Sequence, residues 1–252
     1  MTETPMPLAA IHPRAIVEVR TIRSLAASTI ALAGRAQRGP VNQATAIWRF
    51  ADFERIFGGL WADSRLGFEV RDFFHQGGAQ AIVVRLYHAG RTGRSHAALD
   101  ANGLLLRALT PGNWGNLLRA RIDHNVVPSD SSRFNLTVRD CGTGKLEIFR
   151  NLSWRGDHPR RADAVLAAGS KLVSAALPAA RPRAHANLAP SATPPRVALW
   201  ADNALATSAR VGVLADDGGP LEVTDFTGPI EFDGEKGRYI MRDADFFKLL
   251  RT

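Results

Sequence analysis

Residues 50–86 read FADFERIFGGLWADSRLGFEVRDFFHQGGAQAIVVRL, and they predict two helices followed directly by a strand. In the first segment the apolar side chains recur at helical spacing, at Phe50, Phe53, Ile56 and Phe57. The pattern stops at Gly58-Gly59, and glycine readily takes the left-handed conformation that often follows the last turn of a helix. We therefore expect the first helix to end at this pair.

The second helix is predicted by another apolar face, which follows Asp63 and Ser64, two residues that can cap a helix N-terminus. Its apolar members are spaced i, i+4, i+7 and i+8, at Leu66, Val70, Phe73 and Phe74. The pair Gly77-Gly78 then closes the pattern. Each of the two helices has one apolar face, and each face must pack against another part of the protein.

A buried strand supplies that partner. The run is β-branched and aliphatic on consecutive positions, at Ile82, Val83, Val84 and Leu86. Such a run is typical of a strand that is covered on both faces in a parallel sheet. Upstream, residues 28–33 predict a first core strand, residues 34–40 a turn, and residues 44–48 a second short strand. We expect a right-handed β-α-β crossover with helices over the sheet.

From Leu104 onward the sequence changes to short runs in which apolar and polar residues alternate. Three such runs, residues 104–127, 134–140 and 145–153, are separated by turn residues. This pattern predicts an antiparallel β-sandwich or meander inserted into the α/β part. Trp114, which lies between two glycines, is interpreted as a core side chain in a loop rather than as a platform for a ligand.

The remainder of the chain predicts shorter elements. His158-Pro159-Arg160 opens a helix over residues 161–168, and residues 171–177 return as a strand. Residues 178–195 are rich in Pro and Ala without periodicity, so we expect an extended, exposed loop or linker. The predicted fold class is therefore mixed α+β, with a small α/β core and an inserted β-sandwich.

Length and composition are those of a soluble globular protein. The chain has 252 residues and is 45% hydrophobic, which suffices for one large core or two modest ones. No window approaches the roughly 20 apolar residues of a membrane span, so we expect no membrane insertion. The opening residues lack a charged segment followed by an apolar one, and we expect no secretory signal. The single cysteine, Cys141, fits a reducing compartment.

The formal net charge is +8, which raises the question of a nucleic-acid partner. The basic residues are scattered among acidic ones, and the densest cluster is Arg155, Arg160 and Arg161 around His158. We therefore interpret the charge as solvated surface and expect no nucleic acid. A further interpretation is that the arginines serve protein interfaces, where their planar fork makes paired contacts.

No pattern in the sequence predicts chemistry. The histidines occur singly, at positions 12, 75, 88, 96, 124, 158 and 185. There is no Gly-x-Ser-x-Gly elbow and no His-Glu-x-x-His. Gly142-Thr143-Gly144-Lys145 lacks the remainder of a phosphate loop and predicts a hairpin turn. His158 is the best single candidate for a site, and we interpret it as a helix-entry residue. We expect no catalytic residue, no cofactor and no metal.

Several of these segments resemble the N-terminal part of contractile phage tail sheath proteins. Residues 28–47, STIALAGRAQRGPVNQATAI, look like the family's first core strand and its turn, and residues 50–86 look like the helices and strand that follow. Residues 109–116, LTPGNWGN, and 149–166 look like its β-sandwich insertion. Residues 221–250 resemble the entry into its subtilisin-like domain.

The resemblance implies an N-terminal arm that links subunits. A short extended segment with alternating residues precedes the core, and it consists of Ala15, Ile16, Val17, Glu18, Val19, Arg20, Thr21 and Ile22. In sheath proteins the matching segment adds a strand to a neighbouring subunit. The family usually reads Gly-Val-Tyr-x-Glu-Glu here, which this chain does not. The alternative is an edge strand that pairs within its own subunit.

The same resemblance implies a division of the chain. It gives an N-terminal arm over residues 1–25, an α/β core segment over 26–98, and a β-sandwich insertion over 99–177. A Pro/Ala-rich loop covers 178–196, and a β-rich segment over 197–252 leads into a subtilisin-like domain. The sequence stops at Thr252, before most of that domain, and we expect an incomplete N-terminal portion of a subunit. The alternatives are a split or degraded gene product and a short divergent relative.

The function implied by the resemblance is structural. A sheath subunit forms a homo-oligomer around an inner tail tube, above a baseplate, and contracts to drive the tube through an envelope. The implied location is the virion tail, after assembly in the bacterial cytoplasm. Two alternatives from other classes are an α/β hydrolase-like enzyme and a monomeric β-sandwich binding module.

Overall fold

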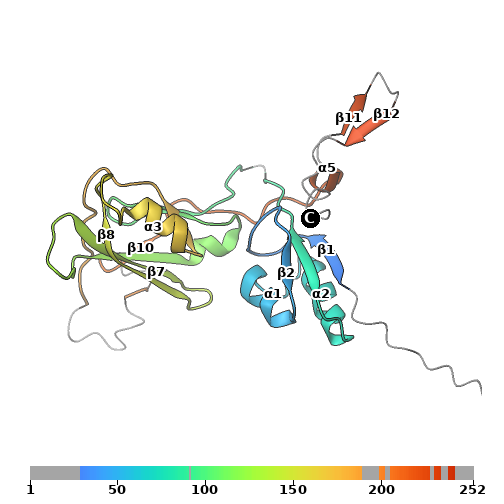
Figure 1. Ribbon diagram of the computed structural model, residues 1–252, viewed down its shortest axis with the longest axis horizontal. Helices are drawn as coiled ribbons and strands as arrows, with labels where there is room; N and C mark the ends of the chain where they lie inside the picture. Colours follow the sequence, from blue (N-terminus) through green and yellow to red (C-terminus); the bar gives the residue numbers. More distant parts are fainter. Residues whose placement is uncertain are drawn as a thin grey trace, which may run out of the picture.

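A computed structural model gives the fold of this protein (Figure 1). It describes residues 29–90, 92–188, 199–201, 205–227, 230–233 and 238–241. The predicted arm, Ala15 to Ile22, lies outside these residues. The described chain forms a mixed α and β structure, as predicted, and Figure 1 shows an α/β part beside a larger, mostly β part.

The α/β unit, residues 29–86, is built around a central strand. Its elements are β1 (Ile30–Gly34), β2 (Thr45–Ile47), α1 (Phe50–Phe57), α2 (Leu66–His75) and β3 (Ala81–Arg85). The strand order is β1-β3-β2, with β1 parallel to β3 and β2 antiparallel to β3. The predicted β-α-β crossover from β1 to β3 is therefore confirmed. The sheet is mixed rather than purely parallel, because the short β2 runs the other way.

The helices of this unit end for the reasons that the sequence suggests. Gly58 takes φ 97° after α1, and its N–H donates to the carbonyl of Glu54 at 3.1 Å. The N-cap of α2 is Arg65, whose side chain makes no capping bond, and the preceding Ser64 hydroxyl accepts the N–H of Leu66 at 3.2 Å. The apolar faces meet in one core, whose fully buried members include Ile47, Phe53, Phe57, Val70 and Val83.

The burial of β3 is less complete than the sequence predicts. Ala81, Val83 and Val84 are buried, but Ile82 is only half-buried. The prediction of a strand covered at every position is thus wrong at Ile82. Both helices pack on the face that carries Ala81 and Val83, and on the other face only Val84 is fully buried. The last residue of β3, Arg85, is 1% exposed although it is charged.

The β unit, residues 97–188 and 205–215, contains two antiparallel sheets. Its elements are β4 (Ala98–Asp100), β5 (Leu105–Ala108), the 3-10 helix η1 (Asn113–Leu117), β6 (Leu118–Asp123), β7 (Arg133–Asp140), β8 (Leu146–Ser153), α3 (Ala162–Gly169), β9 (Val173–Ala175) and β10 (Ala209–Arg210). One sheet has the order β10-β6-β7-β8 and the other β4-β5-β9. Both contribute to one core, since Leu106, Ile122, Leu136 and Leu166 belong to the same buried cluster.

Two predicted details of the β unit are confirmed. Residues 142–145 form the turn of the antiparallel β7–β8 hairpin, in which Arg139 pairs with Leu146. Trp114 lies in η1 and packs against the buried cluster. The Pro/Ala-rich segment differs from its prediction. Residues 178–188 form no helix or strand, but Pro182 and His185 are buried. The His185 N–H donates to the Ile122 carbonyl at 2.9 Å, so this part of the segment lies against the sheet.

The described C-terminal part consists of a short helix and a hairpin. Helix α5 (Val223–Thr227) follows the turn at 216–220, and β11 (Ile230–Asp233) pairs antiparallel with β12 (Arg238–Met241). Figure 1 shows α5 close to the α/β unit and the hairpin beyond it. Among the residues that the structure describes, none of the helices has the length and apolar character needed to span a bilayer.

Candidate functional site at the junction of the two units

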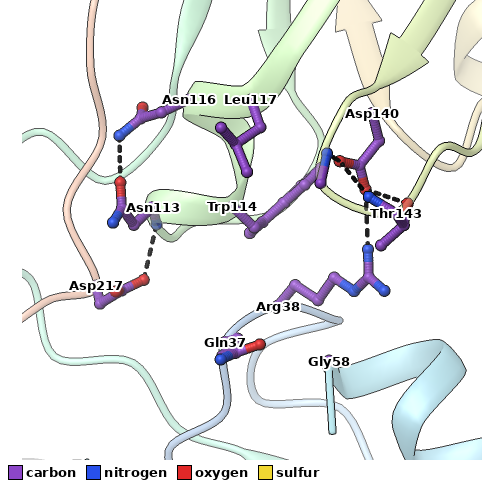
Figure 2. Close-up of a pocket in the computed structure, with 11 residues that line it drawn as sticks. Gln37, Arg38, Gly58, Asn113, Trp114, Asn116, Leu117, Asp140, Thr143 and Asp217 are labelled. Atoms are coloured by element: carbon purple, nitrogen blue, oxygen red, sulfur yellow. Dashed lines mark hydrogen bonds and ion pairs between the residues drawn. The ribbon is translucent and has the colours of Figure 1, made fainter.

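Polar side chains from both units meet at the junction between the α/β unit and the β unit. The turn over residues 35–40 leaves β1 and faces η1 with the loop before it, residues 109–117 (Figure 2). The end of the β7–β8 hairpin and the segment around Asp217 complete the junction. Two stretches that carry the sheath resemblance, 34–40 and 109–116, therefore contact each other although they are far apart in sequence.

Arg85 lies at the centre of this junction. Its Nε donates to the carbonyl of Ala36 at 2.9 Å and its Nη1 to that of Gly39 at 2.8 Å. Its Nη2 donates to the carbonyls of Gln37 at 3.4 Å and Pro111 at 2.8 Å. A buried guanidinium satisfied by backbone carbonyls holds their positions, because each acceptor left unpaired would cost free energy. Arg85 therefore fixes the 36–39 turn and joins it to the β unit.

The electrostatics of Arg85 follow from its burial. Desolvation lowers the pKa of its guanidinium to about 10, and the carboxylate of Asp217 acts in the opposite direction. The guanidinium carbon also lies 5.8 Å from the ring centroid of Tyr87, within cation–π range. A guanidinium with this pKa is charged at neutral pH. The positive charge is thus held by the dipoles of four backbone carbonyls, which accept the hydrogen bonds described above.

An ion pair joins the two units beside Arg85. Arg38 Nη1 lies 3.1 Å from Asp140 Oδ2, and the two side chains are 19% and 3% exposed. Asp140 ends β7, and its carboxylate also accepts the N–H of Gly142 at 2.9 Å and the Thr143 hydroxyl at 2.6 Å. The hydrogen bonds within the turn therefore fix the orientation of the carboxylate that pairs with Arg38. The same bonds stabilise the turn at Cys141-Gly142-Thr143-Gly144.

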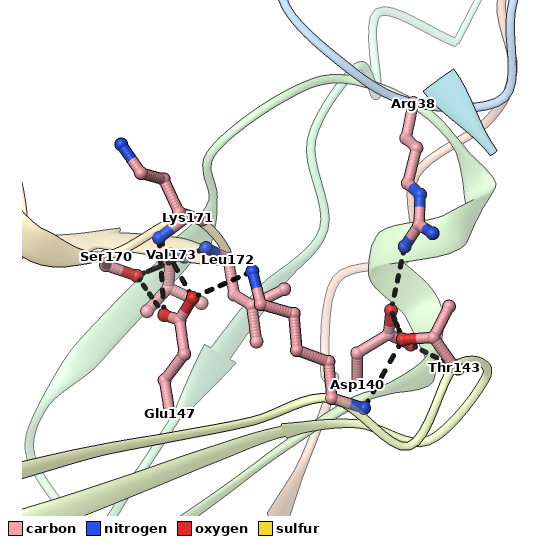
Figure 3. Close-up of polar contacts among 9 residues, drawn as sticks. Arg38, Asp140, Thr143, Glu147, Ser170, Lys171, Leu172 and Val173 are labelled. Atoms are coloured by element: carbon pink, nitrogen blue, oxygen red, sulfur yellow. Dashed lines mark hydrogen bonds and ion pairs between the residues drawn. The ribbon is translucent and has the colours of Figure 1, made fainter. Parts of the chain in front are cut away.

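On the β8 side of the same hairpin turn, Glu147 is tied to the segment after α3 (Figure 3). The Glu147 carboxylate accepts the Ser170 hydroxyl at 2.7 Å and the Lys171 N–H at 3.1 Å, and Lys145 Nζ lies 3.2 Å from it. The Ser170 Oγ in turn accepts the N–H of Val173 at 2.9 Å. The hairpin is thus anchored on two sides, to the α/β unit through Asp140 and to the second sheet through Glu147.

Glycine permits the closest backbone approach across the junction. Gly112 has φ 124°, and a Cβ placed there would lie 2.6 Å from the Gln37 carbonyl oxygen. Gly39 has φ 103°, and a Cβ there would lie 2.9 Å from the carbonyl oxygen of Ile56. Neither position can accept a side chain without a backbone shift. These glycines explain why the two loops can bring their carbonyls to one guanidinium.

A cavity of about 440 Å³ opens at the junction (Figure 2). Its walls come from residues 37–38, Gly58, residues 113–117, the 140–143 turn and Asp217. The lining carries amide, indole, guanidinium and carboxylate groups, and none of the described residues in it is a serine, cysteine or histidine. The Trp114 Nε1 and Arg38 Nε atoms have no hydrogen-bond partner within the described chain. The one hydroxyl in this lining, that of Thr143, donates to the Asp140 carboxylate, which is also held by the Gly142 N–H and by Arg38.

The other candidates from the sequence lie apart from this junction. His158 Nδ1 accepts the N–H of Arg160 at 3.0 Å, which is a helix-entry contact. The Ser95 hydroxyl lies 2.8 Å from His96 Nδ1, and Arg107 Nη2 lies 2.8 Å from the same atom. Burial, followed by Arg107, lowers the pKa of His96. The third group is a guanidinium and not the carboxylate that orients a catalytic histidine. In the described part of the chain no group of three His, Cys, Asp or Glu residues could hold a metal ion.

Two solved structures that resemble this chain are sheath tail proteins. One, from Listeria innocua, has 16% sequence identity and a TM-score of 0.49, over 81% of this chain and 37% of that one. Another, from Desulfitobacterium hafniense, has 14% identity and a TM-score of 0.45, over 77% of this chain and 36% of that one. The chain thus spans little more than a third of either protein. No protein-family model and no curated protein sequence matches it.

Sequence reasoning did not identify the residues that form the junction. Arg85 carried a signal, since it is a single charge within the apolar run AIVVRL. Asp140 carried a weaker one, because an aspartate before Cys-Gly-Thr-Gly can accept the N–H groups of a turn. Arg38 belongs to the Gly-Arg-x-x-Arg-Gly-Pro turn of the sheath resemblance, at residues 34–40, but nothing there indicated its partner. The predicted arm residues lie outside the described chain, so the structure does not bear on them.

Proposed function

We propose that this chain is part of a structural subunit of a contractile tail sheath, in a phage or a phage-derived injection system. In this proposal the subunits form a homo-oligomer around an inner tail tube, above a baseplate, and contraction drives the tube through an envelope. The chain would assemble in the bacterial cytoplasm and act in the tail. It would have no catalytic site, no cofactor and no nucleic-acid partner.

The observation that carries the proposal is the way in which the two units are joined. Arg85 links carbonyls of both units, the Arg38–Asp140 pair crosses the same junction, and Asn113 N–H donates to Asp217 Oδ1 at 2.7 Å. A subunit that transmits force between neighbours must move as a rigid body, since slack between its parts would absorb the motion. The junction supports such a role. It is also formed by the segments on which the sheath resemblance rests.

The division into arm, α/β core, β-sandwich insertion, loop and C-terminal segment is part of the same proposal. In it, residues 15–22 add a strand to a neighbouring copy. An extended segment with alternating side chains can pair through its backbone, so its N–H groups carry the interaction. Replacing Val17 by proline removes one donor and fixes φ. The variant Val17→Ala keeps the donor and serves as the matched control.

Assembly tests the proposal directly. The purified chain, and the longer subunit that contains it, are examined by sedimentation velocity and negative-stain electron microscopy. Rings or filaments, which are lost in Val17→Pro but kept in Val17→Ala, are the expected result, with unchanged circular dichroism in both variants. A longer subunit that stays monomeric at every concentration contradicts the structural role. Normal assembly of Val17→Pro contradicts only the role of the arm.

The two alternatives predict other outcomes. A hydrolase-like enzyme predicts hydrolysis that is abolished by serine-directed reagents, and the one serine–histidine contact described above, Ser95–His96, has a guanidinium where that chemistry needs a carboxylate. A monomeric binding module predicts a single species in sedimentation under all conditions. Both outcomes are measured on the same purified protein as the assembly experiment.

A further inference from the structure

The residues directly after β3 hold the segment that leads into α5. The carbonyl of His88 accepts the N–H of Gly219 at 3.0 Å, and the Tyr87 hydroxyl lies 3.2 Å from Asp216 Oδ1. The Thr92 hydroxyl donates to the other oxygen of Asp216. At Gly218 a Cβ would lie 2.2 Å from the His88 carbonyl oxygen, so the two backbones are in close contact. The segment 216–219 is therefore fixed on the α/β unit.

The side chain of His88 continues this contact to the start of α5. Its Nδ1 lies 3.1 Å from Asp225 Oδ1, and its Nε2 lies 3.8 Å from Glu222 Oε1. The second oxygen of Asp225 accepts the N–H of Glu222 at 2.6 Å, and the Asp225 N–H donates to the carbonyl of Glu222 at 3.1 Å. One carboxylate therefore binds both the imidazole and the first turn of the helix. A change in the protonation of the imidazole therefore changes the contact that holds the first turn of α5.

The charged groups that face His88 come from residues 216–225, and each of them has a defined partner. Glu222 and Asp225 face the imidazole with negative charge. Asp216 is engaged by Tyr87 and Thr92. A cation that contacts this segment, Arg35, donates to the backbone carbonyls of Asp217 and Gly218 at 3.2 and 3.3 Å. The hydrogen bond to Asp225, followed by its charge, raises the pKa of His88.

We propose that His88 is a pH-operated latch that holds the start of α5 on the α/β unit. Protonated His88 makes an ion pair with Asp225 and attracts Glu222. Neutral His88 keeps at most one hydrogen bond. Figure 1 shows α5 close to the α/β unit, where this contact holds it.

The sign of the effect follows from the direction of the pKa shift. A histidine whose pKa is higher in the bound state stabilises that state fully below its free value, about 6.5. The stabilisation is lost as the pH rises through the shifted value. The latch is therefore closed under mildly acidic conditions and loosens toward alkaline ones. Because both partners are partly exposed, salt weakens it.

Hydrogen exchange measures the latch. Amide exchange of residues 222–227 is followed by mass spectrometry at pH 6.0 and 8.5, with correction for the intrinsic exchange rate. Protection of these amides should be about threefold greater at pH 6.0, the size expected for a partly exposed ion pair. In His88→Asn, which retains a donor near the position of Nδ1, protection should not change with pH. Asp225→Asn should lose both the protection and its pH dependence.

An exposed histidine on α2 supplies the control, because His75→Asn removes a titrating group and leaves the latch intact. This variant should behave like the unchanged protein. Equal protection at both pH values in the unchanged protein overturns the proposal, as does a pH dependence that survives in His88→Asn. Titration of the His88 ring by NMR gives an independent measurement, and a pKa at or below 6.5 also overturns it.

Discussion

Arg38 and Asp140 are 102 positions apart in the sequence, and their side chains form an ion pair of 3.1 Å across the junction of the two units. Asp140 is the more deeply buried partner, with a side chain that is 3% exposed. Its oxygens also accept two N–H groups of the hairpin turn, so the carboxylate belongs to a connected network. Such a pair is costly to break from one side, because the remaining charge stays buried.

Asp140→Asn should therefore destabilise the protein by about 2–4 kcal/mol, since the buried network loses its negative charge and one oxygen acceptor. Urea denaturation followed by circular dichroism gives the free energy of unfolding. Asp72→Asn is the control, because Asp72 is 55% exposed in its pair with Arg71. A surface pair of this kind contributes about 0–1 kcal/mol. Equal losses for the two variants contradict the role assigned to Asp140.

Replacing the buried guanidinium of Arg85 should have a larger effect. Arg85→Met leaves the carbonyls of Ala36, Gly39 and Pro111 without their donor, and we expect a loss of about 3–5 kcal/mol. Arg85→Lys keeps the charge but not the planar fork, so its loss should be intermediate. Calorimetry adds a second measurement. The unchanged protein should unfold in one transition, whereas Arg85→Met should separate the transitions of the two units.

The close approach of the two loops can be tested at glycine. Gly112→Ala places a Cβ 2.6 Å from the Gln37 carbonyl oxygen, and Gly144→Ala places one in open space. Both glycines have positive φ, at 124° and 75°. The second variant thus measures the conformational cost alone, about 1–2 kcal/mol. Gly112→Ala should lose clearly more stability than Gly144→Ala in urea denaturation. A smaller loss shows that the loops do not meet as described.

The sequence was sufficient where structure depends on local pattern. Helix α1 ends at Gly58, as predicted, because the apolar period and the glycine signal coincide there. The 142–145 turn was predicted because apolar alternation stops on both sides of it. Helix α5 was not predicted, since its five residues are too few to show a period. The burial of His185 was also missed, because it depends on contacts with a strand more than 60 positions away.

The junction could not be predicted for a related reason. The acceptors of Arg85 are backbone carbonyls, at Ala36, Gln37, Gly39 and Pro111, and any residue type carries a carbonyl. Their convergence is therefore a property of the loop conformations and leaves no residue pattern. The signals in the sequence were the glycine at position 112 and the isolated charge at position 85. Neither signal predicts which residues the position contacts.

The buried histidine gives a pH effect opposite in sign to that of His88. His185 Nδ1 accepts the N–H of Ile122 at 3.0 Å, so the ring must stay neutral at that atom. Burial, followed by the charge of Arg121, lowers the pKa of His185. The unfolded chain then binds the proton more readily. Stability from this group is present above pH ~6.5 and is lost as the pH falls from there through the folded-state pKa.

His185→Asn should reduce this loss, because the amide oxygen can accept the Ile122 N–H and does not titrate. The difference between the free energies of unfolding at pH 7.5 and 5.0, measured in urea, should become smaller in the variant. Some difference should remain, since burial also lowers the pKa of His96. His75→Asn, at an exposed position, should leave it unchanged. A difference in His185→Asn as large as in the unchanged protein means that the buried ring is not the group whose protonation opposes folding.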